Sequence, residues 1–280
     1  MLFATASLAK RIEKAEATLI TEAARATAAR VGSDGVFIHQ FSGGVAVHAG
    51  DGAPFNKVAG LGFLGVPEER QFEEIEREMA ARNAQVQVEI STLGYPALGR
   101  MLTERGYALV GFENVLGLAL DAAYPPARQP DPSIAISRPS TQEDDGAWLE
   151  AVLTGFLNQD TYDGPASHES FDGDVLRRVY EDMANARGFE RYLARAAGDV
   201  AGGASLRICE GVAQLCGAAT LPAYRRRGIQ SSLLRHRLAE SARRGCDVAV
   251  VTTAPGSKSQ QNVQRAGFEL LYARAILVKG

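Results

Sequence analysis

The chain has few cysteines, no long apolar run and no excess of basic charge, and each scarcity excludes a class of protein. It has 280 residues, three cysteines and 30 Lys and Arg against 33 Asp and Glu, for a net charge of −3. Cys209, Cys216 and Cys246 show neither paired spacing nor neighbouring histidines, which disfavours a disulfide scaffold or a zinc motif and is typical of reduced thiols. No stretch approaches the ~20 apolar residues of a membrane span. Without a basic surplus, nucleic acid is a poor partner.

The N-terminal segment is charged as well as apolar. Lys10, Arg11, Glu13 and Lys14 interrupt its first hydrophobic residues, whereas a secretory signal needs a longer unbroken apolar run. Residues 7–30 are rich in alanine and predict a helix with mixed charge. We therefore expect a cytoplasmic protein with no membrane partner and no bound metal.

A proline cluster divides the chain. Residues 121–133 contain Pro125, Pro126, Pro130 and Pro132, and so many fixed φ angles and missing N–H donors exclude a helix or a central strand. Strand-like and helix-like runs alternate on both sides, which predicts an α/β (α+β) architecture. We predict one domain over residues 1–120, a linker over 121–133 and a second domain over 134–280.

The two halves resemble each other. Residues 88–107 align without gaps to residues 249–268, and both read as strand, turn with proline, helix, then glycine and an aromatic residue. Both are followed by a β-rich run, at residues 108–120 and 269–279. The helical pattern of residues 67–82 falls opposite residues 228–243 at the same offset. This self-similarity indicates a duplicated domain.

One loop in the second half has the composition of a phosphate cradle. A strand-like run at residues 212–220 leads into Arg225-Arg226-Arg227-Gly228, and an apolar helical stripe begins at Ile229. A helix N-terminus directs unpaired N–H groups and a positive dipole end at one point, and Gly228 allows close approach. The structural alternative is a solvated basic turn, but cations at a helix start oppose the dipole, by about 0.3–1 kcal/mol each. The pattern therefore favours a pyrophosphate ligand.

This loop resembles the acyl-CoA loop of the GNAT N-acetyltransferase superfamily, whose pattern is Arg or Gln, two residues, Gly, one residue, Gly or Ala. Arg225 and Gly228 match it, and Gln230 departs from it at the last position. The resemblance covers about residues 134–280, through the strand at 247–253 and the Gly267-Phe268 pair. It implies two GNAT-like domains, each a mixed, mostly antiparallel twisted sheet flanked by helices, with acetyl-CoA bound by the second.

The resemblance also implies an activity and a set of residues. A GNAT enzyme transfers an acetyl group from acetyl-CoA to a primary amine by direct attack, with no metal. The residues predicted to bind the donor are Ala218, Ala219, Thr220, Leu221, Arg225, Arg226, Arg227, Gly228, Ile229, Gln230, Ser231, Ser232 and Asn262. The partners expected are acetyl-CoA and a small-molecule or peptide amine, bound by a monomer that is its own pseudo-dimer or by a homodimer.

The proton-transfer groups are less clear from the sequence. Where many family members have a tyrosine that protonates the leaving thiolate, this chain has Val263. We name Tyr272 and Ser259 as substitutes, each with an ordinary structural alternative. Glu210 is a further candidate that relays a proton through water, although its position also suits a turn. The missing tyrosine motivates a second hypothesis, a non-catalytic acyl-CoA sensor.

The acceptor is indicated only by an acidic stretch. Residues 157–174 contain five carboxylates and no Lys or Arg, which suits a cationic amine, and we predict that Tyr162, Asp163 and His168 contact it. A solvated polar loop explains the same composition. The acceptor's identity is therefore open.

A glycine pattern in the first half suggests a different cofactor. Residues 60–65 form a literal GxGxxG, the fingerprint of a dinucleotide fold. However, Pro67 suits the first helical position, so all three glycines precede the helix, and Glu68 and Glu69 would repel a pyrophosphate. We interpret the first half as a GNAT-like copy without its CoA loop. A nicotinamide-dependent enzyme is the remaining alternative.

Overall fold

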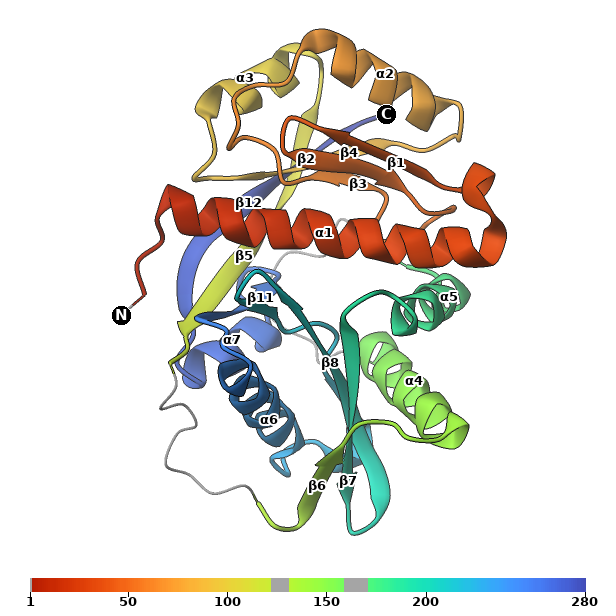
Figure 1. Ribbon diagram of the computed structural model, residues 1–280, viewed down its shortest axis with the longest axis vertical. Helices are drawn as coiled ribbons and strands as arrows, with labels where there is room; N and C mark the ends of the chain where they lie inside the picture. Colours follow the sequence, from red (N-terminus) through yellow and green to blue (C-terminus); the bar gives the residue numbers. More distant parts are fainter. Residues whose placement is uncertain (1, 122–130, 159–170) are drawn as a thin grey trace.

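The computed structural model describes residues 2–121, 131–158 and 171–280 (Figure 1). In the first half the helices are α1 (Ala6–Val31), α2 (Glu69–Ala80) and α3 (Pro96–Glu104), with a short 3-10 helix at Ser33–Gly35, and the strands are β1 (Phe37–Phe41), β2 (Gly44–His48), β3 (Lys57–Ala59), β4 (Val86–Ser91) and β5 (Ala108–Ala119). In the second half the helices are α4 (Gln142–Leu157), α5 (Gly173–Ala184), α6 (Ile229–Arg243) and α7 (Lys258–Arg265), with a 3-10 helix at Pro222–Tyr224, and the strands are β6 (Ile134–Ser137), β7 (Phe189–Ala196), β8 (Asp199–Cys209), β9 (Val212–Gln214), β10 (Ala219–Thr220), β11 (Val248–Thr253) and β12 (Glu269–Lys279).

The described strands form one continuous sheet. Their order is β1-β2-β3-β4-β12-β5-β11-β9-β8-β7-β6, and β10 pairs with β8 beside this path. The pairs β3–β4 and β9–β11 are parallel, and the other pairs are antiparallel. The predicted fold class, a mixed and mostly antiparallel sheet flanked by helices, is confirmed.

The two halves exchange their last strands. β5 belongs to the first half in sequence but pairs with β11 of the second, and β12 of the second half pairs with β4 of the first. At the centre β5 and β12 pair with each other, and Glu113 lies opposite Arg274. These two residues are separated by 161 positions, which is the offset of the sequence repeat. Equivalent residues of the two copies therefore pair across a local two-fold axis, which supports the duplication; the boundaries at 120 and 134 stay predictions.

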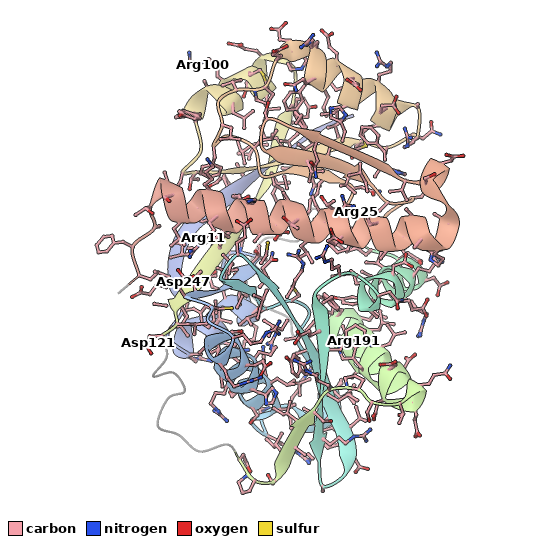
Figure 2. The ribbon with its side chains drawn as sticks, viewed as in Figure 1. Arg11, Arg25, Arg100, Asp121, Arg191 and Asp247 are labelled. Atoms are coloured by element: carbon pink, nitrogen blue, oxygen red, sulfur yellow. The ribbon has the colours of Figure 1, made fainter. Side chains whose placement is uncertain are left out.

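Helix α1 lies across the middle of the molecule and contacts both halves (Figure 1). Its 26 residues confirm the predicted N-terminal helix, and Thr5 caps it by accepting a hydrogen bond from the N–H of Leu8 at 3.1 Å. Figure 2 shows Arg11 beside Asp247, and the two form an ion pair of 2.6 Å between α1 and the second half.

Buried ions lie beneath α1. Arg274 donates to Glu13 at 2.8 Å, and Lys57 donates to Glu89 at 2.7 Å. All four residues are buried, so these pairs join α1 to β12 and β3 to β4 inside the molecule. No helix in the described ranges is long and apolar enough to cross a membrane.

Candidate active site

Two parallel strands of the second half separate at the centre of the sheet. β9 runs beside β11 as far as the hydrogen bond from Leu215 N–H to the carbonyl of Val250, at 3.0 Å. Beyond that point β10 pairs only with β8, while β11 continues beside β5. β10 and β11 are therefore not paired with each other, and we call this separation of the two strands the gap.

A bulge marks the point where the strands part. Cys216 and Ser205 exchange two backbone hydrogen bonds, at 3.0 and 3.1 Å, but the next pair is Ala219 with Gly203, so β9–β10 contains one extra residue. Gly217 lies in this bulge with φ of +42°. A trans peptide points its C=O and N–H in opposite directions. Because the Cys216 carbonyl points to β8, the Gly217 N–H points toward β11 and the gap, and it donates to no described protein atom.

The loop after β10 leads to an uncapped helix. Gly228, with φ of +82°, is the N-cap of α6, and no side chain caps it. The first helical bond runs from Ser232 N–H to the Gly228 carbonyl at 2.9 Å. In the described ranges the four N–H groups of residues 228–231 donate to no protein atom. Since Gly228 is exposed, these donors and the positive end of the helix dipole are open to an anion.

Three arginines surround this helix start. Arg225 donates to the carbonyl of Asn158 at the end of α4. Arg226 is exposed and has a positive φ of 62°. The Arg227 guanidinium lies 5.5 Å from the ring centre of Tyr224. The loop therefore carries three arginines directly before the helix start, of which Arg226 and Arg227 are exposed and Arg225 is half-buried.

The other residues predicted to bind the donor border the same gap or serve the core. The main chain of residues 218–221 follows the bulge, and the Thr220 hydroxyl is buried without a hydrogen-bond partner in the described ranges. Asn262 of α7 donates to Gln230 of α6 at 3.0 Å, which joins the two helices. Ile229 is a core residue, while Ser231 is exposed and Ser232 accepts a hydrogen bond from Arg235 at 3.1 Å.

The equivalent features of the first half are closed. The carboxylate of Glu68 caps α2 in a capping box with Gln71, so the helix start already has an anionic partner. Gly62, in the glycine pattern, accepts a hydrogen bond from Tyr95 N–H at 2.8 Å, which joins the loop after β3 to the chain after β4. The glycines of residues 60–65 therefore form a turn packed against α3, with no exposed row of N–H donors at a helix.

Two of the candidate proton-transfer residues lie away from the gap. Tyr272 is buried among residues of α1, and its hydroxyl donates to Glu13 at 2.7 Å. It lies on β12, two strands from β11, which is about 10 Å. Glu210 forms the turn between β8 and β9 and pairs with Lys14. Seven residues of β8 separate this turn from the pairing partner of Thr220, or about 23 Å.

The other candidates for proton transfer and acceptor binding lie on α7 or outside the described residues. Ser259 is exposed in the first turn of α7, and Ser257 caps that helix instead. Val263, at the family's tyrosine position, is a buried core residue. Tyr162, Asp163 and His168 lie outside the described residues.

Two side chains that the sequence analysis did not single out, Tyr180 and Arg237, contact the bulge at Cys216 and Gly217. A methyl group placed on Gly217 would lie 3.3 Å from the hydroxyl of Tyr180 on α5. Arg237 of α6 donates to the Cys216 carbonyl at 3.2 Å from the opposite side. Burial raises the pKa of the Cys216 thiol to about 12, so it stays protonated at neutral pH. Burial likewise raises the pKa of the Tyr180 phenol, which therefore remains a proton donor.

The sequence contains a pattern from which Arg237 could have been identified. Arg237 interrupts the apolar stripe of Leu233, Leu234 and Leu238, and a cation on the buried face of a helix is unusual. No such pattern marks Tyr180, because an aromatic residue on an amphipathic helix is normally part of the core.

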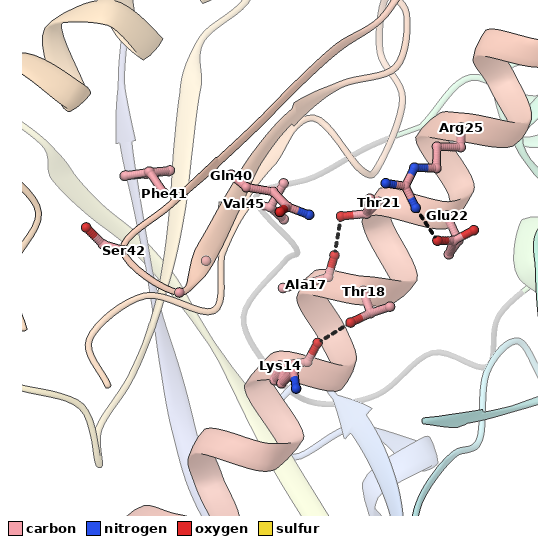
Figure 3. Close-up of a pocket in the computed structure, with 12 residues that line it drawn as sticks. Lys14, Ala17, Thr18, Thr21, Glu22, Arg25, Gln40, Phe41, Ser42 and Val45 are labelled. Atoms are coloured by element: carbon pink, nitrogen blue, oxygen red, sulfur yellow. Dashed lines mark hydrogen bonds and ion pairs between the residues drawn. The ribbon is translucent and has the colours of Figure 1, made fainter. Parts of the chain in front are cut away.

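A pocket lies between α1 and the β1–β2 hairpin, in the first half of the chain. It has a volume of about 390 Å³ and is lined by polar side chains including Lys14, Thr18, Arg25 and Gln40 (Figure 3). Its cations already have partners, since Lys14 pairs with Glu210 and Arg25 with Glu22. No group of His, Cys, Asp or Glu side chains in the described ranges is arranged to hold a metal ion.

Comparison with known proteins finds similarity to one family over the part of the chain that contains this gap. Residues 157–268 match the model of the Acetyltransferase (GNAT) family. None of the curated proteins searched matches the chain significantly. A GCN5-related N-acetyltransferase from Kribbella flavida shares 19% identity, with a TM-score of 0.59 over 92% of this chain and 95% of that one. One from Sphaerobacter thermophilus shares 16%, with a TM-score of 0.58 over 87% and 75%.

A tandem GNAT protein from the clavulanic acid biosynthesis pathway shares 12% identity, with a TM-score of 0.60 over 92% of this chain and 87% of that one. At these identities the solved structures show a common fold. The family model adds that residues 157–268 are similar to the Acetyltransferase (GNAT) family, a likeness that indicates acyl transfer from acyl-CoA.

Proposed function

We propose that the protein transfers an acetyl group from acetyl-CoA to a primary amine. The observation that carries this proposal is the start of α6 at the exposed Gly228, where four backbone N–H groups have no described protein acceptor and three arginines directly precede the helix. A diphosphate satisfies those donors and removes the conflict between the arginines and the helix dipole. The capped start of α2 supports a single donor site, in the second half.

The gap between β10 and β11 suits the rest of the donor. Its two strands, which are not paired with each other, offer N–H and C=O groups with which the amides of pantetheine form hydrogen bonds. A pantetheine chain that runs inward from the α6 start brings the thioester to the bulge at Gly217. There the free N–H of Gly217 suits the thioester oxygen.

The chemistry follows from that arrangement. The lone pair of the amine forms a bond to the thioester carbon while the C=O π electrons move to oxygen. The C=O bond then reforms as the C–S bond breaks, giving an amide and a CoA thiolate. The nitrogen loses one proton and the thiolate gains one. Tyr180, protonated and beside the bulge, is our candidate for the second transfer.

The alternative function is a non-catalytic acyl-CoA sensor, which is favoured by the burial of Tyr272 against Glu13. Turnover separates the two. The enzyme predicts release of CoA thiol from acetyl-CoA with at least one member of a panel of primary amines, at a rate well above hydrolysis. Calorimetric binding of CoA without such turnover would support the sensor, and the absence of CoA binding would refute both.

A further inference from the structure

Arg237 is a buried cation that pairs with no carboxylate in the described ranges. It lies on the inner face of α6 and is only 3% exposed. Its Nη1 donates to the carbonyls of Ser205, at 2.8 Å, and Cys216, at 3.2 Å, and its Nε donates to Leu233 at 3.2 Å. Burial lowers the pKa of this guanidinium to about 10, so it still carries its charge at neutral pH. Burying such a group without a counter-charge is costly.

Stability alone does not account for these hydrogen bonds. The Ser205 carbonyl already accepts from Cys216 N–H, and the Cys216 carbonyl already accepts from Ser205 N–H. Both oxygens would therefore keep a backbone donor if Arg237 were replaced by an apolar residue of similar length. Arg237 adds a positively charged donor to the carbonyl oxygen of the peptide that joins Cys216 to Gly217.

We propose that Arg237 is a positioning residue that aims and polarises the Gly217 N–H toward the thioester carbonyl. The proposal rests on the proposed function, which brings the thioester to the bulge. A charged donor on the carbonyl oxygen of a peptide draws electron density from its nitrogen and strengthens its N–H as a donor. Because that N–H points into the gap, the guanidinium acts on the reacting oxygen through one peptide unit.

The bulge makes this arrangement rigid. Gly217 has a positive φ, and a Cβ there would lie 3.3 Å from Tyr180. The pair of bonds between Cys216 and Ser205 fixes the peptide from one edge, and Arg237 fixes it from the α6 face. As negative charge develops on the thioester oxygen, this prearranged N–H stabilises it without reorganisation. Arg237 itself exchanges no proton and no electrons.

Three variants and one control test the proposal. Arg237→Met removes the charge, Arg237→Gln keeps a neutral donor and remains available if the methionine variant folds poorly, and Arg237→Lys restores the charge. Arg243→Met is the matched control, because Arg243 lies on the same helix, is exposed and forms an ion pair with Glu240 at its surface. We measure kcat from thiol release, with the most active amine or with water as acceptor, and the Kd of CoA by calorimetry. Infrared spectroscopy of bound acetyl-CoA labelled with ¹³C at the carbonyl reports polarisation directly.

The expected result separates rate from binding. Arg237→Met lowers kcat about 10- to 100-fold, less than the 10²–10³-fold typical of losing a direct oxyanion donor. The Kd of CoA stays within about threefold, and the carbonyl stretch of bound acetyl-CoA rises toward its value in water. Arg237→Gln behaves similarly, Arg237→Lys recovers much of both, and Arg243→Met matches the wild type.

Other outcomes overturn the proposal. An unchanged stretch and kcat in Arg237→Met would exclude any influence on the carbonyl. Parallel losses of kcat and CoA affinity with an unchanged stretch would make Arg237 a structural residue. If the wild type binds no CoA, the proposed function itself fails, and this inference falls with it.

Discussion

The most direct test of the donor site is Gly228→Glu. A Cβ at this position meets nothing closer than the Cδ1 atom of Ile134, at 3.8 Å, so the substitution causes no clash. Its φ of +82° is unfavourable for any residue with a Cβ, at about 1 kcal/mol. That strain is small against the 5–15 kcal/mol by which native domains are stable. The fold should therefore survive.

The effect on binding should be much larger. A carboxylate at residue 228 would lie on the order of 6 Å from a diphosphate at the helix start. With an effective dielectric constant of about 40, two negative charges at that distance each cost about 1.4 kcal/mol, or roughly 3 kcal/mol together. This corresponds to roughly a 100-fold increase in the Kd of CoA.

Calorimetry of CoA binding at low salt measures this change, and thermal unfolding checks the fold. Gly228→Ala carries the same backbone strain without the charge, so it should lose less than about tenfold in affinity. Since salt screens the repulsion, the difference between the two variants should shrink as ionic strength rises. Equal affinities for the wild type and Gly228→Glu would refute a diphosphate at this helix start.

Four other predictions address the first half, the bulge and the buried ions. Gly62→Ala should reduce the unfolding temperature, because its φ is +90° and Leu98 lies 3.3 Å from the new methyl group, but calorimetry should show unchanged CoA affinity. Tyr180→Phe should lower kcat about 10- to 100-fold with little change in CoA binding, if its phenol protonates the thiolate. Lys57→Met should lower the free energy of unfolding in urea by about 3 kcal/mol, because Glu89 keeps a buried charge, and adding Glu89→Gln should recover part of it. Burial raises the pKa of Glu113 from 4.5 to about 7, so the folded state binds this proton more tightly than the unfolded state does, and the free energy of unfolding should fall as pH rises from 4.5 through 7. Glu113→Gln should remove that pH dependence. Identical pH profiles of stability for the wild type and the variant would contradict the prediction.

The sequence predicted those features that depend on local chemistry. The glycine before an apolar stripe defined the start of α6 at Ile229, because a positive φ and a helical period are both legible in the chain. The repeat at an offset of 161 anticipated which strands are equivalent. The repeat could not show that β5 and β12 are exchanged between the two halves. Such an exchange changes the strands with which β5 and β12 pair, but it does not change their sequences.

The placement of the candidate side chains was not legible in the sequence for the same reason. Tyr272 and Glu210 were named as candidates for the proton-transfer groups, and in the structure Tyr272 packs beneath α1 while Glu210 lies at the far end of β8. Tyr180 and Arg237 reach the bulge from two helices that are far apart in sequence. Only tertiary packing brings such groups together, so no local pattern could identify them.

The two copies differ in how they satisfy one helix start, and this difference explains how a duplicated fold can keep a single site. α2 begins with Glu68, whose carboxylate accepts from the backbone N–H of Gln71 in the capping box and so places an anion at the helix start, and the bond from Tyr95 to Gly62 closes its loop. α6 begins with Gly228, which has no side chain with which to cap the helix. The first copy has thereby gained an internally satisfied and stable turn, worth about 1 kcal/mol for the cap. The second has left its donors unpaired, and an unpaired row of N–H groups beside arginines is stable in water but far better satisfied by a diphosphate.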